Sequence, residues 1–280
     1  MSGTLYIVGT PIGNLGDLSP RALETLTDAD FIAAEDTRVT LKLLNHFEIK
    51  NRLVSYHEHN RTEKGPGIVD RILLGESCAL VTDAGMPAIS DPGMELVRMC
   101  REAGVPVVTV PGPSAVVTAL AFSGLNAARF SFEGFLSVNK PSRRQHLAEI
   151  KDEKKTMVFY EAPHKLAATL RDLYEALGDR RVALIKELTK IHESIELSTL
   201  SELSGKYDGV KLKGEYVIVI EAKTPEELAA EKPDVDPVAL ARRYLAEGLS
   251  VNEAAKRAAK ETGEKKSDIY KELSETKSEK

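Results

Sequence analysis

The chain has 280 residues, and its length suits two domains and a tail on a prior of roughly 100–200 residues per domain. Hydrophobic residues make up 42% and charged residues 29%, which predicts a packed core and excludes a largely disordered chain. The formal net charge of −5 argues mildly against a nucleic-acid-binding protein, although one local basic patch is enough to bind phosphate.

Residues 1–124 alternate between short apolar runs and helical patterns. The runs are residues 5–8, 31–34, 53–56, 79–82 and 107–110, and the helical patterns are residues 19–27, 38–46, 62–74, 93–103 and 114–122. This alternation predicts an α/β domain whose mainly parallel sheet is buried on both faces. Ser19-Pro20 is a typical helix start, with a capping serine before a proline.

A second α/β domain is predicted over residues 125–222. Its strands are expected at residues 130–136, 156–160, 182–185, 193–198 and 215–221, and its helices at residues 142–151, 164–176 and 199–206. Two strand patterns follow each other between residues 182 and 198 without a helix between them. This succession predicts a mixed sheet.

An acidic, proline-flanked stretch at residues 223–236 is predicted to be a linker. Residues 237–273 then show three short amphipathic helical patterns, and Ser250 with Glu253 forms a capping box at the second. Two interpretations of this extension stay open. It is a helix-turn-helix module, or it is a small packing or dimerising appendage.

The two cysteines, Cys78 and Cys100, lie in apolar or helical patterns and are expected in the core, without a disulfide or metal role. The first residues lack a signal-peptide pattern, and no run approaches the ~20 apolar residues of a membrane span. We therefore expect a soluble cytoplasmic protein.

Three loops follow predicted parallel strands, at residues 8–16, 81–93 and 110–115. Ligands of open α/β folds bind at that edge of the sheet. The first loop has neither the dinucleotide fingerprint nor a P-loop pattern. The second has a carboxylate, Asp83, that can accept hydrogen bonds from an amino group or a ribose. In the third, Ser114 begins a helix whose free N–H groups face the same crevice.

Together with other blocks, these loops resemble the class III methyltransferases, or tetrapyrrole methylases. The blocks are residues 9–15, 34–38, 55–60, 83–93, 160–164, 186–190 and 214–216. The resemblance covers about residues 4–222, and the helical tail also matches an extension found in the family. It implies two α/β domains of the tetrapyrrole methylase type, with the methyl donor in the cleft between them, and a homodimer.

The resemblance also implies the donor, S-adenosylmethionine, and the residues that contact it. These are Pro11, Asp83, Ala84, Gly85, Met86, Ile89, Ser114, Ala115, Tyr160 and Glu161. They come from all three loops and from the second domain. A metal is not expected, because the pair His57 and His59 has no matching further ligands.

The blocks at residues 34–38 and 55–60 are similar to those of a branch of the family that acts on ribosomal RNA of the small subunit. The implied reaction is 2′-O-methylation of a cytidine ribose in the decoding region of 16S RNA. Candidate bases are Glu35, Asp36 and Glu187, and Arg38 is expected to hold a phosphate or carboxylate. Nothing in the sequence selects among the three carboxylates.

A basic run after the first strand of the second domain contains Lys140, Arg143 and Arg144, which we expect to contact the RNA backbone. Two other hypotheses about the function stay open. One keeps the fold and donor but uses a tetrapyrrole or another small acceptor. The other is a non-catalytic nucleic-acid-binding protein led by the helical tail.

Overall fold

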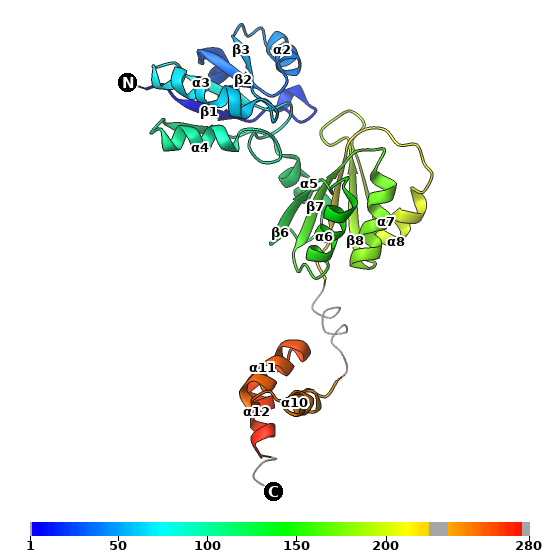
Figure 1. Cartoon of the computed structure of the whole chain (residues 1–280). Helices are drawn as coiled ribbons and strands as arrows, with labels where there is room; N and C mark the ends of the chain where they lie inside the picture. The colour runs from blue at the N-terminus through cyan, green and yellow to red at the C-terminus, as the bar shows by residue number, and fades with distance from the viewer. Residues whose placement is uncertain (1, 224–234, 276–280) are drawn as a thin grey trace. The chain divides into compact units, whose positions relative to one another are not determined.

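The computed structural model describes residues 2–223 and 235–275 and divides the chain into two compact units, Met1–Ala222 and Lys223–Lys280 (Figure 1). The first unit contains two five-stranded sheets, and the second contains three helices. The predicted linker at residues 223–236 lies mostly outside the described residues. No helix of the described residues is long and apolar enough to cross a membrane.

The first sheet is entirely parallel, with the strand order β3-β2-β4-β1-β5. Its strands are β1 (Leu5–Val8), β2 (Phe31–Ala34), β3 (Leu53–Ser55), β4 (Cys78–Val81) and β5 (Val107–Val110). Its helical elements are η1 (Leu15–Asp17), α1 (Pro20–Asp28), α2 (Thr37–His46), α3 (Arg61–Leu73) and α4 (Met94–Glu102). Side chains of α3 and α4 pack on one face and those of α1 and α2 on the other.

The predicted burial on both faces holds for the central strands β2 and β4, in which every residue is buried. It is wrong for β5, where Val108 and Thr109 are exposed. The reason is that β5 is an edge strand, paired only with β1 among the described residues. Cys78 and Cys100 are buried, unpaired core residues, as predicted.

The second sheet is mixed, as predicted, with the strand order β6-β7-β10-β8-β9. Its strands are β6 (Phe130–Gly134), β7 (Thr156–Glu161), β8 (Arg181–Lys186), β9 (Ser194–Thr199) and β10 (Tyr216–Ile220). Only β6 and β7 pair in parallel, and the last strand in sequence, β10, lies between β7 and β8.

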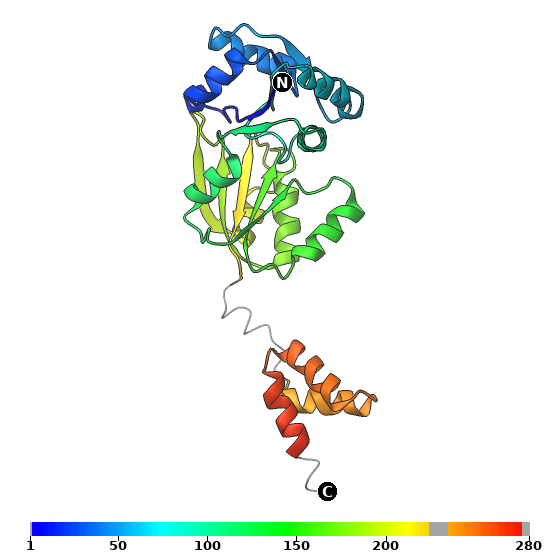
Figure 2. The same cartoon turned by 90° about the vertical axis from the view of Figure 1, so that its left-hand side faces the viewer.

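Helices cover both faces of this second sheet (Figures 1 and 2). One face carries α6 (Lys140–Ile150), α7 (Leu166–Leu177) and α8 (Leu200–Lys206). The other carries α5 (Ala115–Ser123), whose Val116, Ala119 and Leu120 pack on β7, β8 and β10. Helix α5 follows the first sheet in sequence but packs on the second, so the chain crosses between the two sheets before α5 and not after it.

The second unit consists of α10 (Pro237–Ala246), α11 (Val251–Thr262) and α12 (Lys266–Glu275) around its own small apolar core. The capping box of Ser250 and Glu253 begins α11, as predicted. Gly263 ends α11 with φ 74°, a left-handed conformation that glycine adopts without a steric penalty.

Candidate active site

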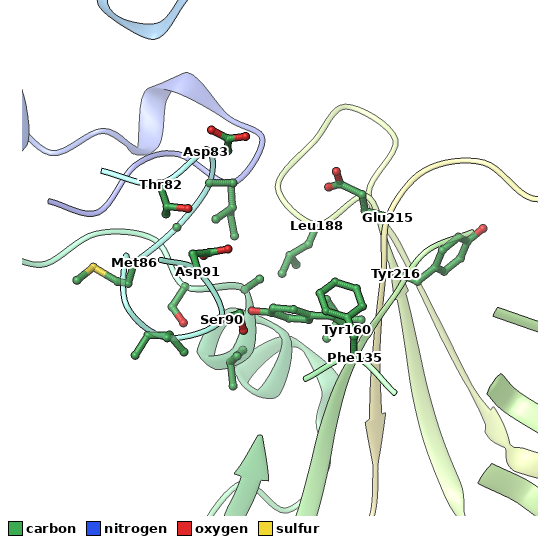
Figure 3. Close-up of a pocket in the computed structure, with 18 of the residues that line it drawn as sticks. Thr82, Asp83, Met86, Ser90, Asp91, Phe135, Tyr160, Leu188, Glu215 and Tyr216 are labelled. Atoms are coloured by element: carbon green, nitrogen blue, oxygen red, sulfur yellow. The ribbon is translucent and has the colours of Figure 1, made fainter. Parts of the chain in front are cut away.

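A cavity of about 480 Å³ opens where the carboxyl ends of the first sheet's strands face the ends of β7 and β10 (Figure 3). A volume of this size is typical of small-molecule sites. Its walls come from the loop after β1, the loop after β4, the start of α5 and the ends of β7 and β10. The lining residues include Ile12, Glu35, Thr82, Asp83, Met86, Asp91, Ser114, Phe135, Tyr160, Leu188, Glu215 and Tyr216.

Backbone contacts hold the loops of the first sheet together beneath the cavity. Thr10 and Gly85 form a two-way bridge, with N–H···O distances of 2.9 and 3.1 Å. The backbones of Gly9 and Gly112 lie so close that a Cβ on Gly112 would be 2.7 Å from the Cα of Gly9. Glycine is therefore required at this crossing for steric reasons.

The loop after β1 also packs against the loop between β8 and β9. A Cβ on Gly13 would lie 2.6 Å from the Cγ of Lys190 and 2.9 Å from the Oγ1 of Thr189. In the same loop, Glu187 and Thr189 adopt positive φ angles of 53° and 67°. This strained turn brings Leu188 into the wall of the cavity.

The cavity is lined by carboxylates from both sheets. Burial, followed by repulsion from Glu35, raises the pKa of Asp91 to about 6. Partial burial also raises the pKa of Asp83, which accepts a hydrogen bond from the Asp36 N–H at 3.1 Å. Glu35 accepts a hydrogen bond from the buried hydroxyl of Thr82 at 2.5 Å. Such an environment suits a positively charged ligand.

The second sheet contributes an aromatic wall. The rings of Phe132 and Phe135 pack edge-on against Tyr160, with centroids 5.0 and 5.6 Å away, and Phe135 and Tyr160 line the cavity (Figure 3). Burial raises the pKa of Tyr160 to about 12, while a backbone hydrogen bond from Val116 opposes the rise. The Tyr160 hydroxyl therefore lies at the N-terminal turn of α5.

Nine of the ten expected donor-binding residues lie on the cavity wall. They are Asp83, Ala84, Gly85, Met86, Ile89, Ser114, Ala115, Tyr160 and Glu161. Pro11 is not among the lining residues, and its neighbour Ile12 is. Placement on the wall is a requirement for donor contact, and the contacts themselves stay a prediction.

The candidate catalytic residues are distributed differently. Glu35 lines the cavity, whereas Asp36, Arg38 and Glu187 do not. The guanidinium of Arg38 holds the pKa of Asp36 at about 2, and the two side chains pair at 2.6 Å. Burial acts to raise the pKa of Glu187, but hydrogen bonds from Lys190 and from the Glu215 N–H outweigh it and lower the value. Both carboxylates are therefore weak bases.

The three basic residues expected to contact RNA lie together around a separate hollow on α6 and α7. Lys140 and Arg144 are exposed there. Arg143 is less available than these two residues for contact with RNA, because its guanidinium donates to Asp172 at 2.5 Å and to the hydroxyl of Thr169 at 2.9 Å.

Several wall residues were not singled out from the sequence. Asp91 sits in the loop that follows β4, eight positions after Asp83, and the acidic character of that loop was the available signal. Glu215 and Tyr216 belong to the block at residues 214–216, which carried the resemblance without an assigned role. Thr82 and Leu188 lie in segments named from the sequence, residues 81–93 and 186–190, without an assigned role, whereas Phe135 carried no signal.

The two histidines after β3, His57 and His59, lie close to each other. Within residues 2–223 and 235–275, no group of three or more histidine, cysteine, aspartate or glutamate side chains is arranged to hold a metal. The rings of His57 and His59 pack edge-on with centroids 6.1 Å apart.

This fold and site define a class of protein. Residues 4–204 match the family described as Tetrapyrrole (Corrin/Porphyrin) Methylases, and the chain belongs to that family of methyltransferase enzymes. A crystal structure of diphthine synthase has the same fold, with a TM-score of 0.64 at 17% identity, covering 79% of this chain and 91% of that one.

Closer relatives narrow the comparison within the family. Ribosomal RNA small subunit methyltransferase I of Halalkalibacterium halodurans is 48% identical over 96% of this chain and 93% of its own. The protein of the same name from Synechocystis sp. is 44% identical over 96% of each chain. Identity at this level over nearly the whole length groups the chain with these proteins.

Proposed function

We propose that the protein transfers a methyl group from S-adenosylmethionine to the ribose 2′-hydroxyl of a cytidine in the decoding region of 16S ribosomal RNA. The observation that carries the proposal is the acidic, aromatic-walled cavity at the carboxyl ends of the first sheet's strands. The names of the relatives support an acceptor in small-subunit ribosomal RNA.

The residues present fit the donor, whose sulfonium and amino groups are positively charged. Asp83 and Asp91 would face those charges, and Tyr160 and Phe135 would pack against its flat ring. Ser114 and the first N–H groups of α5 would serve its carboxylate, since free N–H groups at a helix start attract anions. The bound donor supplies a methyl group with a good leaving group, so the chain mainly has to align the acceptor and accept its proton.

Glu35 is proposed to accept that proton, because it is the one of the three candidate bases named from the sequence that lines the cavity. Asp36 and Arg38 are proposed to act on the acceptor side, where the exposed Arg38 guanidinium can pair with a phosphate. Glu187 is proposed to hold the turn at residues 187–190 through Lys190.

The RNA backbone is proposed to lie along Lys140 and Arg144, with the helices at residues 237–275 as a further contact. A homodimer is proposed as well, and the exposed apolar side chains of Val117, Phe122 and Phe130 are surface that a second copy would bury. The proposed substrate implies a cytoplasmic protein.

The test is transfer of labelled methyl from S-adenosylmethionine to small ribosomal subunits that lack the modification, followed by nucleoside analysis. We expect label in 2′-O-methylcytidine, mostly lost in Asp83→Ala. Firm donor binding by calorimetry without labelled RNA would reject the RNA acceptor and direct the search to small-molecule acceptors. Absence of donor binding would reject the methyltransferase reaction for this chain.

A further inference from the structure

Three hydrogen-bonded side chains, Arg143, Thr169 and Glu161, lead from α6 to the cavity wall. Arg143 on α6 donates to Asp172 on α7 at 2.5 Å and to the hydroxyl of Thr169, also on α7, at 2.9 Å. Thr169 in turn donates to Glu161 at 2.5 Å. Glu161 is the last residue of β7 and lines the cavity.

The chemistry of the three side chains shows which group donates and which accepts in each hydrogen bond. A guanidinium has donors and no acceptor, so Arg143 must donate to the oxygen of Thr169. Thr169 keeps its own hydroxyl proton, which it donates to the carboxylate of Glu161. The other oxygen of Glu161 accepts the Ala162 N–H at 2.8 Å. Both oxygens of Glu161 therefore accept a hydrogen bond.

Burial increases the cost of breaking the hydrogen bonds between these side chains. Glu161 is 3% exposed and Thr169 is 1% exposed, so loss of the Thr169 hydroxyl leaves a largely buried carboxylate short of a hydrogen bond. A buried carboxylate without its hydrogen bonds is costly, and the segment that contains it moves to find new ones. That segment is the end of β7, where Tyr160, Ala162 and Pro163 form one wall of the cavity.

We propose that Arg143 is a positioning residue for the donor cavity, and that it acts through Thr169 on Glu161 to fix the wall at residues 160–163. This role replaces the RNA contact expected of Arg143 from the sequence. It rests on the proposed function, in that the ligand of the cavity is taken to be S-adenosylmethionine. Glu161 then orients the wall through its hydrogen bonds to the Thr169 hydroxyl and the Ala162 N–H.

The test compares Thr169→Val, which removes the hydroxyl at similar volume, with Thr169→Ser, which keeps it. We expect Thr169→Val to raise the Kd of S-adenosylmethionine in calorimetry, and its KM, about tenfold, equivalent to about 1.4 kcal/mol. The KM for the RNA acceptor should change less than twofold. Thr169→Ser should restore the Kd to within threefold of the unaltered protein. Arg143→Gln should behave like Thr169→Val, and Gln145→Ala, an exposed neighbour on α6, should leave the Kd unchanged.

A second measurement separates positioning from phosphate contact. The salt dependence of RNA binding loses about one unit of slope for each phosphate contact removed. We expect that loss for Arg144→Gln and not for Arg143→Gln. An equal loss in both variants would overturn the proposal.

Two further outcomes would also overturn it, and they are distinguishable. If the unaltered protein does not bind S-adenosylmethionine, the proposed function fails and the positioning role fails with it. If the unaltered protein binds the donor, but Thr169→Val binds it with an unchanged Kd, only the positioning role fails. A loss of affinity in Thr169→Ser as large as that in Thr169→Val would likewise overturn the role of the hydroxyl.

Discussion

Replacing Asp91 by asparagine removes a negative charge that the fold holds among other carboxylates. The pKa of Asp91 is raised from 3.8 to about 6, first by burial and then by Glu35 and Asp83. The folded state thus binds the proton more tightly than the unfolded chain does. The contribution of this carboxyl to the free energy of unfolding is complete below pH 3.8 and is lost as the pH rises through about 6. A shift of about two units corresponds to at most ~3 kcal/mol at neutral pH.

We therefore expect Asp91→Asn to be more stable than the unaltered protein at pH 7.5, by about 1–3 kcal/mol in urea unfolding. The advantage should shrink at pH 5, where the native aspartate takes up its proton. The asparagine should also weaken binding of a cationic donor, so stability and affinity would move in opposite directions.

The affinity for S-adenosylmethionine gives an independent check by calorimetry. With a pKa of about 6, protonation of Asp91 should weaken donor binding roughly fourfold between pH 7.5 and pH 5.5. Asp91→Asn should reduce that pH dependence, leaving the smaller part that comes from Asp83. Lower stability of Asp91→Asn than of the unaltered protein at pH 7.5, or a donor affinity that keeps the full pH dependence, would contradict these expectations.

Two further predictions concern packing and unit independence. Gly112→Ala places a Cβ 2.7 Å from the Cα of Gly9 in the first loop, and we expect it to destabilise the protein by about 1–3 kcal/mol in urea unfolding. The control is Gly67→Ala on α3, where an added Cβ meets no atom within 4 Å. This variant should be neutral or slightly stabilising. A chain that ends at residue 222 should bind the donor with a Kd within twofold of the full chain, because all residues lining the cavity lie between Ile12 and Val217; a tenfold loss would contradict this.

The sequence predicted the strands of both sheets because local patterns decide them. Short apolar runs bounded by turns mark each strand, and the loops after β1 and β4 mark the edge at which ligands bind. The donor-side wall of the cavity could thus be predicted from three loops. The resemblance then added Tyr160 and Glu161 from the second sheet, and both line the cavity.

What the sequence did not predict depends on contacts between distant segments. Arg143 and Arg144 are adjacent basic residues that the sequence does not distinguish. Only Arg143 pairs with Asp172, which lies 29 positions further along the chain. Helix α5 has an apolar pattern that suits either sheet, and only packing assigns it to the second. Asp91 differs from Asp83 through burial, which no local pattern records.

The place of β10 in the second sheet has a consequence for how the nascent chain matures. The first sheet needs nothing beyond Val110, but β7 and β8 have no common neighbour until residues 216–220 have been synthesised. Tyr216, at the start of β10, is also part of the cavity wall. Pairings over such sequence distances form slowly, and domains of a growing chain fold in order from the N-terminus. We therefore expect a ribosome-bound chain to carry a finished first sheet and an open second one, and to gain its ligand site only when translation has passed β10.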